Sequence, residues 1–172
     1  MATQTPSTTK KLDELYHLIE GIEIAMLTTL HEDGSLRSRP MQMQQVEFDG
    51  TLWFFTPAES TKVHEIEQDR HVNVAFSAPE QQHYVSMCGR ARLVRDRAKI
   101  DELWNPALKA WFPEGKEDPN VALLKIEVEG AEYWDSPSSA VAHAIALVGS
   151  LVTGKPADPG ENETIELSGS NG

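Results

Sequence analysis

Cysteine is almost absent from this chain of 172 residues, and an excess of positive charge is missing altogether. The single cysteine, Cys88, excludes an intramolecular disulfide and any cysteine-rich zinc or iron–sulfur site. The chain carries 15 Lys and Arg against 27 Asp and Glu, a formal net charge of -12. Because such a surface repels phosphate backbones and anionic lipids, we expect no nucleic-acid partner and no membrane partner.

The two ends of the chain lack the patterns of secretion and membrane insertion. Residues 1–10 are polar and rich in Thr, without the basic and then apolar segments of a signal peptide. The most apolar stretch, residues 140–152, is too short to span a bilayer. We therefore expect a cytoplasmic protein with one domain over residues 10–153 and flexible tails at residues 1–9 and 154–172.

Hydrophobic periodicity predicts about six strands, or seven when the segments on either side of Glu129-Gly130 are counted separately, and four short helices. Asp-Gly pairs at 33–34 and 49–50 predict hairpins, Gly89 a bulge, and Pro40 an edge, bulge or bend. Hairpins favour an antiparallel sheet, and six strands of this length favour closure into a barrel. The expected strands cover residues 24–30, 35–48, 51–56, 71–78, 84–94, 121–128 and 131–135, and the expected helices begin at Lys10, after Ser60, after Asp96 and at Ala140.

The segment from Ser35 to Lys62 is the most informative about chemistry. Arg37 and Arg39 are two residues apart, so on a strand they face the same side. Ser60-Thr61-Lys62 opens a helix, and its free N–H groups, two hydroxyls and lysine suit a phosphate. A strand arginine facing that turn adds a planar donor. In the alternative interpretation, Ser60 only caps the helix and the arginines offset the acidic surface.

The order of several short motifs resembles a known family. Three of them are similar to the flavin-binding split barrel of the pyridoxamine 5′-phosphate oxidase superfamily: Arg39-Pro40-Met41, Phe54-Phe55-Thr56 and the helix start from Ser60 to Ile66. Three later ones are similar to its general stress protein branch: Gly89-Arg90-Ala91, Trp111-Phe112-Pro113 and the run from Ala131 to Asp135. The resemblance implies a mainly β fold, a six-stranded antiparallel split β-barrel with flanking short α-helices.

The resemblance also implies a homodimer that binds FMN at the subunit interface. Carried over by position, Arg39 and Lys62 contact the phosphate, assisted by Ser60 or Thr61. Four residues are expected along the ring and the ribityl chain, the first two through backbone groups: Met41, Gln42, Phe55 and Thr56. Trp111 is expected either as a core or interface anchor, or as a contact that reaches the flavin across the interface.

The substrate does not carry over from the resemblance. Pyridoxamine phosphate oxidases resemble one another in a basic C-terminal motif, whereas Glu132-Tyr133-Trp134-Asp135-Ser136 is acidic and aromatic here. Gln44 stands where a lysine is expected. We therefore expect a flavin-dependent oxidoreductase acting on another small molecule. A non-catalytic flavin-binding stress or sensor protein and a haem-binding split barrel are the alternatives.

The remaining candidate residues suggest no further chemistry. The six histidines show no HxH or HExxH spacing, so we expect no metal site. Cys88 lies inside a strand pattern and is expected to be a small buried hydrophobe. His64 is expected on the surface of its helix. No titratable residue is tied by spacing to the role of catalytic acid or base.

Overall fold

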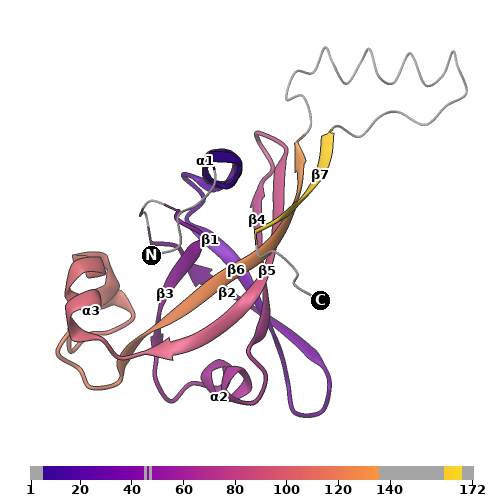
Figure 1. The fold of residues 1–172 in the computed structure, drawn as a ribbon. Coiled ribbons are helices and arrows are strands. Elements are labelled where there is room, and N and C mark those ends of the chain that lie inside the picture. Colours follow the sequence, from indigo (N-terminus) through magenta and orange to yellow (C-terminus); the bar gives the residue numbers. More distant parts are fainter. Residues whose placement is uncertain (1–5, 45, 47, 136–160, 168–172) are drawn as a thin grey trace, which may run out of the picture.

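The computed structural model describes residues 6–44, 46, 48–135 and 161–167 (Figure 1). In chain order its elements are α1 (Pro6–Ile19), β1 (Ile24–Leu30), β2 (Leu36–Gln42), β3 (Thr51–Pro57), α2 (Thr61–Gln68), β4 (His71–Ala78), β5 (His83–Val94), α3 (Arg97–Leu103), the 3₁₀ turn η1 (Pro106–Ala110), β6 (Val121–Asp135) and β7 (Glu161–Glu166). None of the helices in these described segments is long and apolar enough to cross a membrane.

The strands form one antiparallel sheet in the order β2-β1-β4-β5-β6-β3, with β7 added beside β6. In Figure 1, β5 and β6 run as long curved strands with α3 near one end and β7 near the other. β2 and β3 are the ends of this order and are not hydrogen-bonded neighbours in it. The sheet is therefore a split barrel, and the expectation of full closure from strand number alone is wrong.

The two Asp-Gly pairs had different outcomes. Asp33-Gly34 makes the predicted hairpin, since β1 pairs with β2 and Gly34 adopts a φ of +82°. Asp49-Gly50 turns the chain, with the Thr51 N–H donating to Asp49 at 3.0 Å, but it joins no hairpin. β2 ends at Gln42, and β3 pairs instead with β6. The predicted strand 35–48 is therefore too long. The prediction extends it to Phe48 to form a hairpin with β3, but β3 pairs with the distant β6.

Two apolar clusters occupy opposite faces of β3 and β6. Phe54 and Leu124 belong to the main core, which α1 and α2 also fill. Phe55 and Leu123, their chain neighbours, belong to a second cluster with residues of α3 and η1. Successive side chains of a strand point to opposite faces, so the run Leu52 to Phe55 is apolar because both faces are covered.

Several local predictions are confirmed. Val72, Val74 and Phe76 of β4 are buried in alternation. Asp96 caps α3 by accepting from the Ala98 and Lys99 N–H groups. The register shifts between Cys88 and Gly89, which is the predicted bulge.

Other boundaries differ from the prediction. The strands expected at 121–128 and 131–135 form one strand, β6, because the bulge keeps both halves paired with β5. α1 begins at Pro6 rather than Lys10, as proline at a first helical turn allows. β7 lies within the tail expected to be flexible, where it pairs with β6. The helix expected at 140–152 lies outside the described residues.

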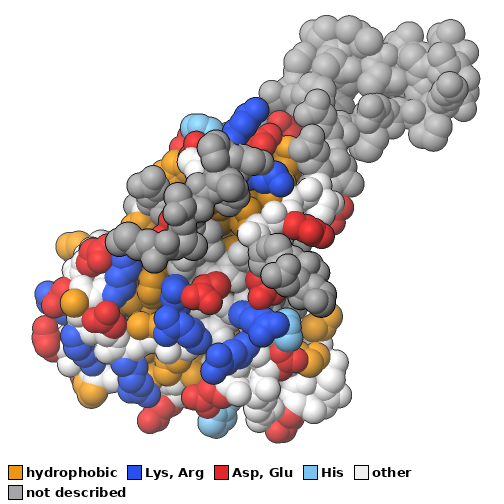
Figure 2. Space-filling view, in the orientation of Figure 1, with side chains coloured by type: hydrophobic (Ala, Val, Ile, Leu, Met, Phe, Trp, Pro, Cys, Tyr) orange, Lys and Arg blue, Asp and Glu red, His pale blue; other side chains and the backbone are white. Residues whose placement is uncertain are grey.

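The outer face of the sheet carries charges of both signs. Figure 2 shows Lys and Arg side chains next to Asp and Glu across the face in view. Arg90 lies 3.0 Å from Glu129, and Lys125 lies 2.7 Å from Glu127.

Cys88 is exposed, so the prediction that it is buried is wrong. Its neighbours Met87 and Gly89 take the core-facing positions of β5, and Cys88 falls on the other face.

Candidate functional site

A pocket of about 450 Å³ lies between the two edges of the sheet, and we call it the edge pocket. Its residues come from β1, β2, β3, α2, η1 and the loops after β2 and η1. They are Ile24, Arg39, Pro40, Met41, Gln42, Gln44, Phe55, Pro57, Lys62, Leu108, Trp111 and Phe112. Most of this wall is apolar, with two cations from β2 and α2, as is usual for small-molecule sites.

Six of the nine residues predicted to bind the cofactor line the edge pocket: Arg39, Met41, Gln42, Phe55, Lys62 and Trp111. The other three are not part of its lining. Thr56 is fully buried and donates to the Pro57 carbonyl oxygen at 3.2 Å. Ser60 lies 3.3 Å from Thr56, measured between the hydroxyl oxygens, and Thr61 is exposed. These three residues lie around the start of α2, and Lys62 is the second residue of that helix.

The first turn of α2 has N–H donors without partners among the described residues. Ser60 stands at the N-cap position but makes no side-chain cap hydrogen bond. Its carbonyl oxygen accepts from the Val63 and His64 N–H groups at 3.0 and 3.2 Å. The Thr61 and Lys62 N–H groups make no hydrogen bond to any described residue, as expected at a helix start. This turn therefore offers the Thr61 and Lys62 N–H groups and the Ser60 hydroxyl beside the edge pocket.

Lys62 adds a charge that no described carboxylate neutralises in an ion pair. Within the described segments no carboxylate lies within ion-pair distance of its ammonium group. Burial lowers the pKa of Lys62, and the nearby Arg39 lowers it further, while Glu65 acts in the opposite direction. An anion placed between the two cations relieves this repulsion, so the electrostatics of the pocket favour a negatively charged ligand group.

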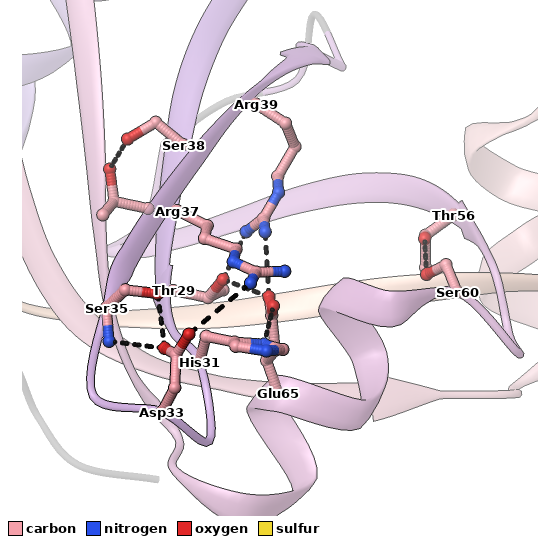
Figure 3. A network of polar contacts seen from close by, with 11 residues as sticks. Thr29, His31, Asp33, Ser35, Arg37, Ser38, Arg39, Thr56, Ser60 and Glu65 are labelled. Atoms are coloured by element: carbon pink, nitrogen blue, oxygen red, sulfur yellow. Dashed lines mark hydrogen bonds and ion pairs between the residues drawn. The ribbon is translucent and has the colours of Figure 1, made fainter.

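Arg39 belongs to a buried polar network that the sequence analysis missed (Figure 3). Its guanidinium donates to the Thr29 hydroxyl, and its Nη2 lies 2.8 Å from the Glu65 carboxylate. The Glu65 side chain is only 3% exposed and comes from α2. Arg39 shares a face of β2 with the buried Met41. Because a buried charge needs a partner, this inward position could have predicted a buried acidic residue beside Arg39.

Glu65 is satisfied on both oxygens. The Thr29 hydroxyl donates to Oε2 at 2.6 Å, and the His31 ring nitrogen lies 2.9 Å from Oε1. Burial by itself raises the pKa of Glu65, but the hydrogen bonds from Thr29, His31 and Arg39 outweigh burial and leave the pKa lowered. Glu65 is therefore a carboxylate at neutral pH, and it holds strands β1 and β2 against α2.

An aromatic wall faces these charges. Trp111 is 70% exposed, and its ring N–H donates to the Gln42 side-chain oxygen at 3.2 Å. Phe55 packs edge-on against Trp104 with ring centroids 5.7 Å apart, and both contact Phe112. Trp104 is thus part of the second cluster, whereas Trp111 stands at the pocket in its own chain.

The backbone N–H and C=O groups of Gln42 point away from β1, the neighbouring strand of β2. The Met43 N–H donates to the Glu23 carbonyl at 2.8 Å, on the β1 side of the chain. Backbone groups alternate sides along a strand, so those of Met41 point to β1 and those of Gln42 point away. Of the two residues expected to offer backbone groups, Gln42 is the one whose backbone groups are not directed at β1, and its carbonyl oxygen accepts from the Gln44 side chain at 3.5 Å.

The other candidates are not part of this site. His64 is 85% exposed and lies 3.4 Å from Glu67 on the outside of α2, as predicted. No group of His, Cys, Asp and Glu among the described residues is arranged to hold a metal ion.

Comparison with known proteins identifies the family. Residues 10–158 match the family described as pyridoxamine 5′-phosphate oxidase like. The chain belongs to this family. Protein bli-3 of Neurospora crassa is 31% identical over 158 residues, which are 86% of this chain and 76% of that protein. General stress protein 26 of Bacillus subtilis is 31% identical over 108 residues, 58% of this chain and 76% of that protein.

A solved structure extends the comparison to the fold. The general stress FMN/FAD binding protein of Xanthomonas citri superposes with a TM-score of 0.66 at 33% identity, covering 76% of this chain and 92% of that one. The predicted resemblance to the oxidase-like family and its general stress proteins is therefore confirmed, and so is the split-barrel fold.

Proposed function

We propose that this protein binds FMN in the edge pocket and is a flavin-dependent oxidoreductase acting on a small molecule. The observation that carries the proposal is the pocket itself, where two cations and an aromatic wall come together from distant parts of the chain. Its family membership and the flavin-binding name of the Xanthomonas relative support the same ligand class.

The residues present fit the two chemically different ends of FMN. Lys62, Arg39 and the free N–H groups at the start of α2 suit a phosphate. Trp111, Phe55 and Pro40 offer apolar surface for a flat ring. The volume of about 450 Å³ lies in the usual range of ligand pockets.

The protein's own part is binding and orientation. A bound flavin supplies the electron transfer. Lys62 and Arg39 fix the phosphate end, and Gln42 presents its outward backbone groups to the polar edge of the ring. Trp111, held by its hydrogen bond to Gln42, forms part of the pocket lining and offers its ring to the flavin. No residue of the pocket is assigned a proton-transfer role.

Titration with FMN tests the binding proposal directly. We expect the flavin absorption bands to shift and flavin fluorescence to change as FMN fills one site per chain. Protein that leaves the FMN spectrum unchanged up to millimolar concentration contradicts the proposal. Haem-type absorption of the purified protein favours the haem-binding alternative. Consumption of reduced nicotinamide by the FMN-loaded protein supports the oxidoreductase, and a loaded protein without turnover of any donor supports the sensor.

We further propose a homodimer whose interface adjoins the edge pocket. Four large apolar residues are exposed on β1, on β2 and after η1: Ile24 at 50%, Met26 at 41%, Leu36 at 73% and Trp111 at 70%. Ile24 and Trp111 also line the pocket, so part of this exposed apolar surface adjoins it. Exposed apolar surface of this kind favours association.

Sedimentation with and without FMN checks the assembly. We expect a dimer in both conditions, and Met26→Glu is expected to shift it toward monomer because a charge replaces an exposed apolar side chain outside the pocket lining. A wild-type protein that stays monomeric and still binds FMN contradicts the proposal of a shared site.

A further inference from the structure

The Glu65 carboxylate lies on the buried face of α2, beside apolar side chains. Val63 and Ile66 are buried at 2% exposure beside it. A carboxylate in such surroundings is costly unless partners compensate for its lost hydration. Glu65 has them in Thr29, His31 and Arg39, three residues from the β1–β2 hairpin. The arrangement therefore links the helix to the one arginine that also lines the edge pocket.

Arg39 keeps donors for a ligand while it is held in this network. A guanidinium carries five N–H donors in a fixed plane. Among the described residues, the Thr29 hydroxyl takes one N–H and Glu65 takes one, so three are left. Because both Nη atoms are engaged, the plane cannot rotate freely about the end of the side chain. Arg39 is 21% exposed and lines the pocket, so the remaining donors are held in a restricted orientation there.

We propose that Glu65 is a positioning residue that acts through Arg39 to make the edge pocket select a ligand bearing a phosphate. This inference rests on the proposed FMN site and adds a residue to it. Positioning and simple charge predict opposite effects. A negative charge beside the pocket by itself weakens anion binding. If Glu65 instead holds Arg39 in place, its removal weakens the binding of FMN.

The test compares FMN with riboflavin, which has the same ring and no phosphate. Glu65→Ala is expected to weaken FMN about tenfold and to leave riboflavin within about twofold. Thr29→Val removes one of the two contacts on Arg39, keeps every charge and suits a strand, so about threefold weaker FMN binding is expected. Both affinities are read from flavin fluorescence at equilibrium, with no need for activity.

Coupling to Arg39 separates positioning from general damage to the fold. In the Arg39→Ala background, Glu65→Ala and Thr29→Val are expected to cause no further loss of FMN affinity beyond about twofold. Equal losses for FMN and riboflavin, tighter FMN binding, or a full further loss without Arg39 overturns the inference. If Glu65→Ala does not fold, Thr29→Val decides alone.

The same titrations distinguish failure of the inference from failure of the proposed function. Wild-type protein that binds neither FMN nor riboflavin contradicts the proposed function. Wild-type protein that binds FMN, with variants that lose both ligands equally, contradicts only the role of Glu65.

Discussion

Lys62→Ala is expected to weaken FMN binding by about 10- to 100-fold, because a charge-assisted hydrogen bond contributes about 1.5–3 kcal/mol. The long-range field of a chain with net charge -12 opposes the phosphate, so local cations must provide the attraction. Lys62 is the cation of the edge pocket without a carboxylate partner among the described residues, whereas Arg39 shares its charge with Glu65. Arg39→Ala is expected to fall in the same range.

Riboflavin and a matched lysine provide the controls. Riboflavin affinity is expected to change little in Lys62→Ala, because the ring end of the pocket is untouched. Lys116→Ala removes the same single charge from a residue that pairs with Asp101 outside the pocket, and FMN affinity should stay near wild type. A loss shared by FMN and riboflavin indicates a disturbed fold, and no loss for either places the phosphate elsewhere.

Gly89→Ala is expected to lower the free energy of unfolding by about 3 kcal/mol or more, the upper range for overpacking a well-filled interior. A Cβ at this position would lie far inside van der Waals contact with the Glu127 carbonyl oxygen and only 3.0 Å from the Val128 Cα. Both neighbours are backbone atoms of β6, so no side chain can rotate to make room. Urea unfolding of the wild type and the variant measures the difference.

Gly130→Ala is the matched control on the facing strand. There a Cβ meets only the Cys88 sulfur and the Ile165 carbonyl oxygen, each at 3.4 Å. That is ordinary contact, so a change within about 1 kcal/mol is expected. If Gly89→Ala is as stable as Gly130→Ala, the bulge is not the tight approach that we describe.

Local features of the fold were predictable because each rests on a few neighbouring residues. Alternation at Val72, Val74 and Phe76 needs only one strand, and the Asp96 cap needs only the next three residues. The pairing of β3 with β6 joins Thr51 to Glu127, far apart in sequence, and no local pattern encodes that choice of partner. The hairpin predicted at Asp49-Gly50 was wrong for this reason.

The candidate site also contains residues that the sequence predicted and one that it did not. Lys62, Arg39, Phe55 and Trp111 were predicted because they belong to short motifs whose order along the chain resembles that of the family. Glu65 was missed because the helix pattern alone gives no sign of its burial, and most acidic residues of an acidic protein are exposed to solvent. Its burial depends on Thr29 and His31 in another element, and only the folded hairpin brings them to the carboxylate.

The edge pocket takes residues from β2 and β3, the first and last strands of the paired order. No backbone ladder joins these strands, and Pro40 on β2 has no N–H to offer one. A ligand seated there contacts both strands at once and bridges the split that hydrogen bonds leave open. By mass action, its binding then resists separation of the two edges, by about 2.7 kcal/mol when the free ligand is at 100 times its Kd. Resistance to opening thus becomes a property of the loaded protein, rising and falling with the supply of ligand.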